Sequence, residues 1–409
     1  RSGISRPGPR SPDDPASRWY SENFDRFLKR CTGLITAETG AEDVVCVLLG
    51  GSFAQGEGTF YMDGDVPVLL SDVDILVVLD SLDLLLALLP ERKRIGEACE
   101  SLLPGARFIG RVDVGIVHRD ELSSFPKSPG TWILRERGRV LHGDAACKRL
   151  LPSFGPGGVR PDESLKLLGN RMASFLGEWP ARPPRKEEDV YSFLYGVCRV
   201  YTDILLSFSV AGSCFLPGYL ERWEAYASGR GEGCHHGGDD DLAARVGFWT
   251  CFKIDPSLGM FGGQVPSFEV MWSLAASDLV DSWKRCSSKV DGTGPGTIGL
   301  RSVREVAGRE SRGTAPLDRL RTWKGLLSGM SLIERCRAVS FAGKALLTST
   351  PEALARAAAL YLVTLASGAG PPGRPEADPG GFPFGGRDWY EAASSCNRWW
   401  KRTVFGREG

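Results

Sequence analysis

The sequence has no excess charge of either sign, because 50 lysines and arginines balance 50 aspartates and glutamates over 409 residues. A chain with no net charge lacks the positive field that draws proteins non-specifically onto nucleic acid. It also lacks a long hydrophobic run: the apolar stretch at 81–90 has only about ten residues, and a transmembrane helix needs about 20. Residues 1–15 contain no apolar signal core. We therefore expect a cytoplasmic protein with no membrane segment.

Paired cysteines are absent as well. The eleven cysteines are spaced singly along the chain, with no CxxC motif and no dense framework. This spacing argues against a small scaffold held together by disulfides, and several cysteines, such as Cys46, lie within apolar runs. We expect buried, reduced thiols, which are typical of proteins in a reducing compartment.

The length of the chain predicts two domains, since one domain usually holds about 100–200 residues. Residues 1–16 are rich in proline, serine and arginine and are expected to be disordered. Segment 17–155 combines helical periodicity with valine-rich runs at 44–49 and 74–79, which are typical of buried strands. From 156 to 409 helical periodicity dominates. The predicted class is α+β: a small mixed-sheet domain over 17–155, then a mainly α-helical domain over 156–409.

A glycine turn and three aspartates are the residues that indicate a chemical function. Gly51 and Ser52 follow the first valine-rich run, and backbone N–H groups in such a turn can hold phosphate oxygens. Asp72 and Asp74 are two residues apart on an extended segment, so their carboxylates project from one face. Asp113 lies on the polar face of a later strand. Adjacent carboxylates repel each other unless a cation lies between them, and Mg²⁺ prefers such oxygen ligands.

The order of these motifs resembles that of the nucleotidyltransferase superfamily, the polymerase-beta-like group. Its signature is a strand with a Gly-Ser turn, an Asp-x-Asp pair and a third aspartate on a later strand, and the resemblance covers about residues 17–150. The segment 138–144, Gly-Arg-Val-Leu-His-Gly-Asp, resembles a closing segment of stand-alone members. One departure is the spacer 53–71, which is longer than usual and would form either a hairpin flap over the nucleotide or an inert insertion.

The resemblance implies a metal-dependent nucleotidyltransferase with a defined set of site residues. Such an enzyme moves a nucleoside monophosphate from an NTP, here expected to be ATP, to an acceptor hydroxyl and releases pyrophosphate. Asp72, Asp74 and Asp113 would be the catalytic residues and would hold two Mg²⁺ ions, or Mn²⁺ in their place. Gly51 and Ser52 would bind the phosphates, and the helical domain would bind the acceptor.

The helical half contains one further candidate for nucleotide binding. In related members a basic residue on a helix after the catalytic domain lies near the triphosphate, with an acid one turn later. Arg199 and Asp203 are four residues apart and match this spacing, which implies a phosphate-binding role for Arg199. An ordinary surface ion pair on a core helix is the alternative reading.

The acceptor has several possible identities, and a small molecule with a hydroxyl group is the expected one. The alternative is the 3′ end of a tRNA-like RNA, because segment 301–344 has ten basic residues against four acidic ones. Those residues would otherwise be the solvated faces of amphipathic helices. Nucleotidylation of a protein and a non-catalytic nucleotide-binding module are the remaining alternatives, and the intact set of three aspartates argues against the module.

Overall fold

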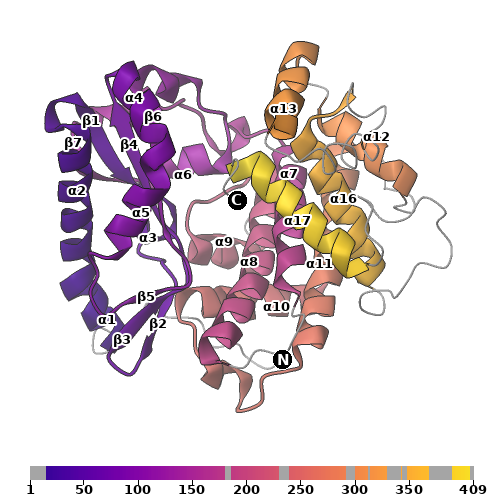
Figure 1. Cartoon of the computed structure of the whole chain (residues 1–409). Helices are drawn as coiled ribbons and strands as arrows, with labels where there is room; N and C mark the ends of the chain where they lie inside the picture. Colours follow the sequence, from indigo (N-terminus) through magenta and orange to yellow (C-terminus); the bar gives the residue numbers. More distant parts are fainter. Residues whose placement is uncertain are drawn as a thin grey trace. The chain divides into compact units, whose positions relative to one another are not determined.

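The structure, a computed structural model, describes residues 15–179, 186–229, 239–291, 300–311, 314–328, 342, 348–367 and 389–405 (Figure 1). Every described strand lies between Val44 and Gly143, and the described residues beyond that point form helices and loops. This arrangement confirms the α+β class. Most of the segment expected to be disordered, residues 1–14, lies outside the described residues.

Contacts within the chain divide it into two compact units, each formed from several segments. Unit 1 consists of Arg1–Arg160, Arg185–Cys198 and Gly212–Val265, and unit 2 of Pro161–Pro184, Arg199–Ala211 and Pro266–Gly409. One break, after Arg160, falls close to the boundary expected after residue 155. The assignment of 17–155 to catalysis and of 156–409 to the acceptor stays a prediction.

The main sheet of unit 1 has four strands in the order β6-β4-β1-β7. They are β1 (Val44–Leu49), β4 (Val73–Leu79), β6 (Val112–His118) and β7 (Arg139–Gly143). β1 is antiparallel to both β4 and β7, whereas β4 and β6 are parallel. The continuous apolar runs of β1 and β4 agree with their central positions, because both faces of a central strand are covered.

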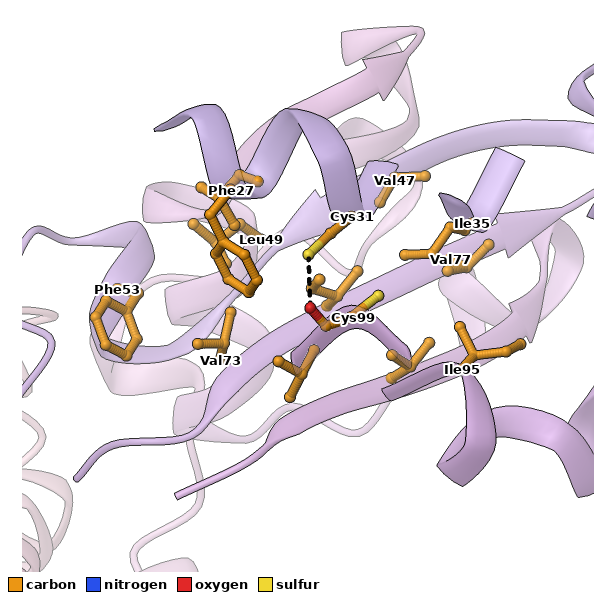
Figure 2. Packing of buried hydrophobic residues seen from close by; sticks show 14 of the residues in the cluster. Phe27, Cys31, Ile35, Val47, Leu49, Phe53, Val73, Val77, Ile95 and Cys99 are labelled. Carbon is orange, nitrogen blue, oxygen red and sulfur yellow. Dashed lines mark hydrogen bonds between the residues drawn. The ribbon is translucent and has the colours of Figure 1, made fainter. Parts of the chain in front are cut away.

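Two helices, α2 (Asp25–Thr39) and α5 (Arg92–Glu100), pack on one face of this sheet (Figure 2). Cys31 of α2 points toward α5 in the figure, and its Sγ donates to the carbonyl oxygen of Cys99, 3.9 Å away. The side-chain hydrogen bond with Cys99 and burial raise the pKa of the Cys31 thiol. A thiol with a raised pKa stays protonated and unreactive at neutral pH. The labelled core residues in the figure also include Phe27, Ile35, Val47, Leu49, Phe53, Val73, Val77 and Ile95.

The other face of the sheet carries a second apolar cluster, which includes a disulfide between Cys46 and Cys147. Cys46 lies in β1, and Cys147 lies in the short helical segment Ala145–Leu150 that follows β7. The disulfide corrects the expectation that the cysteines are all reduced, and Cys214 is disulfide-bonded as well. Spacing along the chain could not predict the bond, because the pairing of β1 with β7 brings together cysteines 101 residues apart.

The long spacer after the glycine turn forms a hairpin. Its strands, β2 (Phe60–Asp63) and β3 (Val66–Leu69), join β5 (Arg107–Phe108) in a second sheet with the order β2-β3-β5. Arg107 holds the end of this sheet through ion pairs with Asp63 and Glu188. The hairpin is thus the form that the spacer takes, and its role as a flap over a nucleotide stays a prediction.

Several helices complete unit 1, and one long helix, α8 (Glu187–Ala211), belongs to it as far as Cys198 and to unit 2 from Arg199 on. α8 is the described helix that is long and apolar enough to cross a membrane, but 78% of its most apolar window is buried inside the structure. The core helix of a globular protein has the same property, so this one helix is weak support for a membrane segment. The remaining described α-helices of unit 1 are α1 (Pro15–Trp19), α3 (Gly51–Ala54), α4 (Leu82–Leu88), α6 (Pro129–Arg137), α9 (Tyr219–Ala227) and α10 (Asp240–Ile254), with a π-helical turn at Tyr20–Phe24.

The described residues of unit 2 form helices and connecting loops, and its core is aromatic. Trp272 stacks on Phe175 at 5.1 Å between ring centres, and Trp179 meets the edge of Trp272 at 4.7 Å. Trp389 packs at 5.7 Å from Trp272 and donates its indole N–H to the Leu362 carbonyl. Its longer helices are α7 (Glu163–Phe175), α11 (Phe268–Asp291), α12 (Leu300–Glu310), α13 (Pro316–Ser328), α16 (Pro351–Ala366) and α17 (Trp389–Phe405).

Removal of the disulfide provides a test of the fold of unit 1. Cys147→Ala should lower the free energy of unfolding by about 2–4 kcal/mol, because a disulfide that closes a long loop restricts the unfolded chain. Urea denaturation measures the loss, and Cys251→Ala, which removes a free cysteine of the same unit, is the control. A tryptic digest without reductant should contain one peptide pair joined through Cys46 and Cys147. Recovery of both peptides as free thiols would show that the bond does not form.

Candidate active site

The three aspartates predicted from the sequence lie on one face of the main sheet. Along β4, Val73, Ile75 and Val77 enter the apolar cluster formed with α2 and α5. Alternate side chains of a strand point to opposite faces, so Asp72 and Asp74 project from the other face. The same alternation in β6, with its valines at 112 and 114 in that cluster, sends Asp113 to the same side as the pair on β4.

Strand pairing brings Asp74 and Asp113 together. β4 and β6 are parallel neighbours, and Asp74 is directly opposite Asp113 in their register. Paired residues on adjacent strands are roughly 5 Å apart, so these two carboxylates belong to one small area of the sheet. The Asp113 side chain is 52% exposed, which leaves it accessible to a ligand.

The glycine turn lies against Asp74. Gly50 donates its N–H to the Asp74 carbonyl oxygen at 2.8 Å, and Gly51 adopts a positive φ of 62°. A Cβ atom added at Gly51 would lie 1.9 Å from Oδ2 of Asp74, which is closer than any contact allows. Only glycine fits there without movement of the carboxylate. Ser52, the next residue in α3, is buried.

Asp72 and Asp113 both interact with Arg111. Oδ1 of Asp72 accepts a hydrogen bond from the Arg111 backbone N–H at 3.0 Å, and the Arg111 guanidinium is 4.0 Å from Oδ2 of Asp113. Over the part of the chain that the structure describes, no three carboxylate, histidine or cysteine side chains are gathered closely enough for a ready-made metal site. The oxygen donors of the three aspartates are nevertheless of the kind that Mg²⁺ prefers, and they share one face.

Arg199 lies on α8, in the part of that helix assigned to unit 2. Asp203, its expected partner four residues on, accepts a hydrogen bond from Nε of Arg171 at 2.7 Å. Burial raises the pKa of Glu178, and the positive charges of Arg199 and Arg171 oppose that rise. Arg199 thus contributes to the electrostatics of unit 2, and its role toward a triphosphate stays a prediction.

A buried lysine, which the sequence analysis missed, holds the segment just before the aspartate pair. Lys253 of α10 is 2% exposed, and its Nζ donates to Oγ1 of Thr59 and to Oγ of Ser71, each at 2.8 Å. The Tyr195 hydroxyl completes the cluster, 2.9 Å from Oγ of Ser71. Since Ser71 immediately precedes Asp72, these contacts fix the start of the segment that carries the aspartate pair. The signal in the sequence that could have indicated this lysine is the largely apolar run 246–252 directly before it.

Comparisons with protein-family models, with curated proteins and with solved structures found no match to this chain. The likeness to nucleotidyltransferases therefore rests on motifs of this chain, chiefly the three aspartates and the glycine turn.

Two single glycine substitutions distinguish the stability cost of backbone strain from the cost of a clash with Asp74. Gly56 also has a positive φ, 74°, but an added Cβ there would meet nothing within 4 Å. Gly56→Ala should lower the free energy of unfolding by about 1 kcal/mol, the usual cost of a left-handed alanine. Gly51→Ala should cost more, because it also displaces the carboxylate of Asp74. Urea denaturation compares the two variants, and equal losses would contradict the contact between Gly51 and Asp74.

The hydroxyl of Ser71 should stabilise unit 1 through its buried partners. Ser71→Ala leaves the Thr59 N–H and one donor of Lys253 without an acceptor, and a buried donor in that state costs about 1–3 kcal/mol. Ser123→Ala is the control, because the Ser123 hydroxyl bonds only the Asp120 carbonyl at the surface. Thermal unfolding should show a lower midpoint for the first variant alone. The same midpoint in both variants would rule out the proposed cluster.

Proposed function

We propose that the chain is a metal-dependent nucleotidyltransferase, which moves a nucleoside monophosphate from an NTP to an acceptor hydroxyl and releases pyrophosphate. The observation that carries this proposal is the pairing of Asp74 with Asp113 on adjacent parallel strands, directly beside the Gly51 turn. Three carboxylates on one sheet face and a turn with unpaired N–H groups are the parts that phosphoryl transfer requires. The proposed nucleotide is ATP.

All three carboxylates would take part in binding the divalent cations. Asp72 and Asp74 would hold the divalent cations, Mg²⁺ or Mn²⁺, which supply charge neutralisation at the phosphates and a lower pKa for the acceptor hydroxyl. Asp113, which is half-exposed beside Asp74, would share the cation that activates the acceptor hydroxyl. The carboxylate oxygens that now contact Arg111 are the ones that would bind the cations. Arg111 would therefore lose its contacts with Asp72 and Asp113 when cations bind.

The turn after β1 would hold the triphosphate. The first N–H groups of a helix have no acceptor within that helix, so those of Gly51 and Ser52 can donate to phosphate oxygens. The positive φ of Gly51 allows the backbone to approach both Asp74 and the ligand. Arg199 is a further candidate for a phosphate contact.

The proposed acceptor is a small molecule. The RNA alternative depends on the basic segment 301–344, and two of its described arginines are already engaged within unit 2. Arg319 donates to the carbonyl oxygens of Ser311 and Thr348, and Arg321 pairs with Asp318 at 3.1 Å. These contacts favour the interpretation that the basic residues of segment 301–344 lie on helix faces and pair with residues of the same unit, and they do not favour RNA binding. The cytoplasmic location stays a prediction from the sequence, and the disulfide bonds of Cys46 and Cys214 argue against it, because such bonds persist mainly in oxidising compartments.

Loss of one carboxylate tests the proposal directly. Asp74→Asn should lower nucleotidyl transfer at least about a thousandfold, because several kcal/mol of metal-based stabilisation are lost and each 1.4 kcal/mol is a factor of ten. Asp120→Asn, at an aspartate that is 88% exposed, should leave the activity unchanged. The assay incubates the protein with Mg²⁺, each labelled NTP and a fractionated cell extract, and follows pyrophosphate release.

The fraction that takes up the label identifies the acceptor. Label in the small-molecule fraction supports the proposal, whereas label in RNA or in protein would replace the proposed acceptor by one of the alternatives. NTP binding without any pyrophosphate release would indicate a non-catalytic module. Full activity in Asp74→Asn would refute the assignment of the metal pair.

A further inference from the structure

A groove in unit 1 is lined by residues of α6 and of the segment that contains α9, two helices labelled in Figure 1, and nothing in the proposed catalytic chemistry uses it. Its volume is about 690 Å³, within the range of about 300–1,000 Å³ that is usual for small-molecule sites. Three residues of α6 form one wall, and residues before and within α9 form the other. The lining residues are Trp132, Glu136, Arg137, Leu216, Pro217, Glu221, Glu224 and Ala225.

The walls of the groove are held in place by buried contacts. The Trp132 ring packs on the buried ring of Phe215, 4.7 Å away between ring centres. The buried guanidinium of Arg222 donates to the carbonyl oxygens of Leu216 and Pro217 at 3.1 and 3.0 Å, which fixes the segment that enters α9. A site built on packed elements can present its polar groups in one geometry to a ligand.

The charged groups of the groove leave two carboxylates available. Arg137 pairs with Glu221 at 2.8 Å, and the other oxygen of Glu221 accepts from the Gly218 N–H. Three glutamates against one arginine leave two negative charges, on Glu136 and Glu224. Glu136 forms a long ion pair, 3.8 Å from Nε of Arg135, and its side chain is 48% exposed and thus accessible to a ligand. Another nitrogen of Arg135, Nη1, donates to the carbonyl oxygens of Arg149 and Leu151. Among the described residues, Glu224 has no side-chain partner.

The groove is connected to the catalytic turn through both of its walls. On one side, Leu134 of α6 lies against Gly50, where an added Cβ would be 3.5 Å from the leucine side chain. On the other, the Glu57 carboxylate accepts from the backbone N–H groups of Tyr219 and Leu220 at 2.9 and 3.2 Å, and so caps α9. Residues on either side of the glycine turn thus contact the two elements that form the walls of the groove.

We propose that this groove binds a small organic molecule with at least two positive charges. Glu136 and Glu224, one from each wall, would pair with its amino groups, and the Trp132 ring would contact a cation or the apolar part of its skeleton. Leu216, Pro217 and Ala225 offer apolar surface to that skeleton. The further step, that this cation is the acceptor of the nucleotidyl group, rests on the proposed function, whereas its binding does not.

Calorimetric titration of the full chain with spermidine tests the binding. Spermidine should bind, and 1,8-octanediol, a neutral chain of the same number of heavy atoms, should not. The double variant Glu136→Gln/Glu224→Gln should weaken the binding of spermidine at least about tenfold, since it removes two charge-assisted contacts without changing the shape of the groove. Glu121→Gln, an exposed glutamate outside the groove, should bind spermidine like the unmodified protein.

The outcomes separate this proposal from the catalytic one. Asp74→Asn should bind spermidine normally, because Asp74 is not among the lining residues, so a failure of the metal site leaves the groove proposal intact. No binding of spermidine by the unmodified protein, or equal binding by the double variant, would overturn the proposal. Equal affinity for 1,8-octanediol would show that the groove selects for shape and not for charge, and would overturn it as well.

Discussion

The parallel pairing of β4 with β6 is the interaction on which the candidate site depends. Its register sets Asp74 opposite Asp113, and the alternation of side chains along both strands places the two carboxylates on the same face. A shift of either strand by one residue would turn its aspartate into the apolar cluster under α2 and α5. Burial of an unpaired carboxylate costs several kcal/mol, so the apolar alternation that builds the core also aims the acidic groups outward.

Helices outside the main sheet hold the segment that precedes the aspartate pair. Lys253 binds the hydroxyls of Thr59 and Ser71, one on each side of the hairpin between β2 and β3. A buried ammonium with hydroxyl partners stays in place only if those partners keep their geometry, so the lysine and the hairpin stabilise each other. Glu57 likewise stabilises the start of α9, because its carboxylate accepts hydrogen bonds from the first N–H groups of that helix. The glycine turn is thereby connected to a helix that follows it by more than 150 residues.

The proposed site combines groups of opposite electrostatic preference. The three aspartates favour cations, and the N–H groups of the glycine turn favour phosphate oxygens, so a metal-bound triphosphate satisfies both. The groove between α6 and α9 would favour cations again, through Glu136 and Glu224. A positively charged acceptor would approach a metal-bound triphosphate with a favourable long-range attraction, since the triphosphate carries more negative charge than its cations neutralise. Zero net charge over the whole chain is compatible with all three local preferences.

The sequence by itself determined the parts of this protein that depend on near neighbours. The valine-rich runs of β1 and β4, the alternation of β6 and the glycine turn were predictable because strand burial and positive φ depend on a few adjacent residues. The α+β class followed from the change to helical periodicity after the strands. The spacing of Asp72 and Asp74 likewise placed both on one face, because the period of a strand is two.

Only the tertiary structure decided which distant residues meet. Cys46 bonds Cys147 because β1 pairs with β7, and Lys253 reaches Thr59 across 194 residues because α10 packs within unit 1. The register that joins Asp74 to Asp113 and the groove between α6 and α9 have the same origin. Such contacts follow from the way whole helices and strands bury their apolar faces, and no local pattern in the chain encodes which partner each face will find.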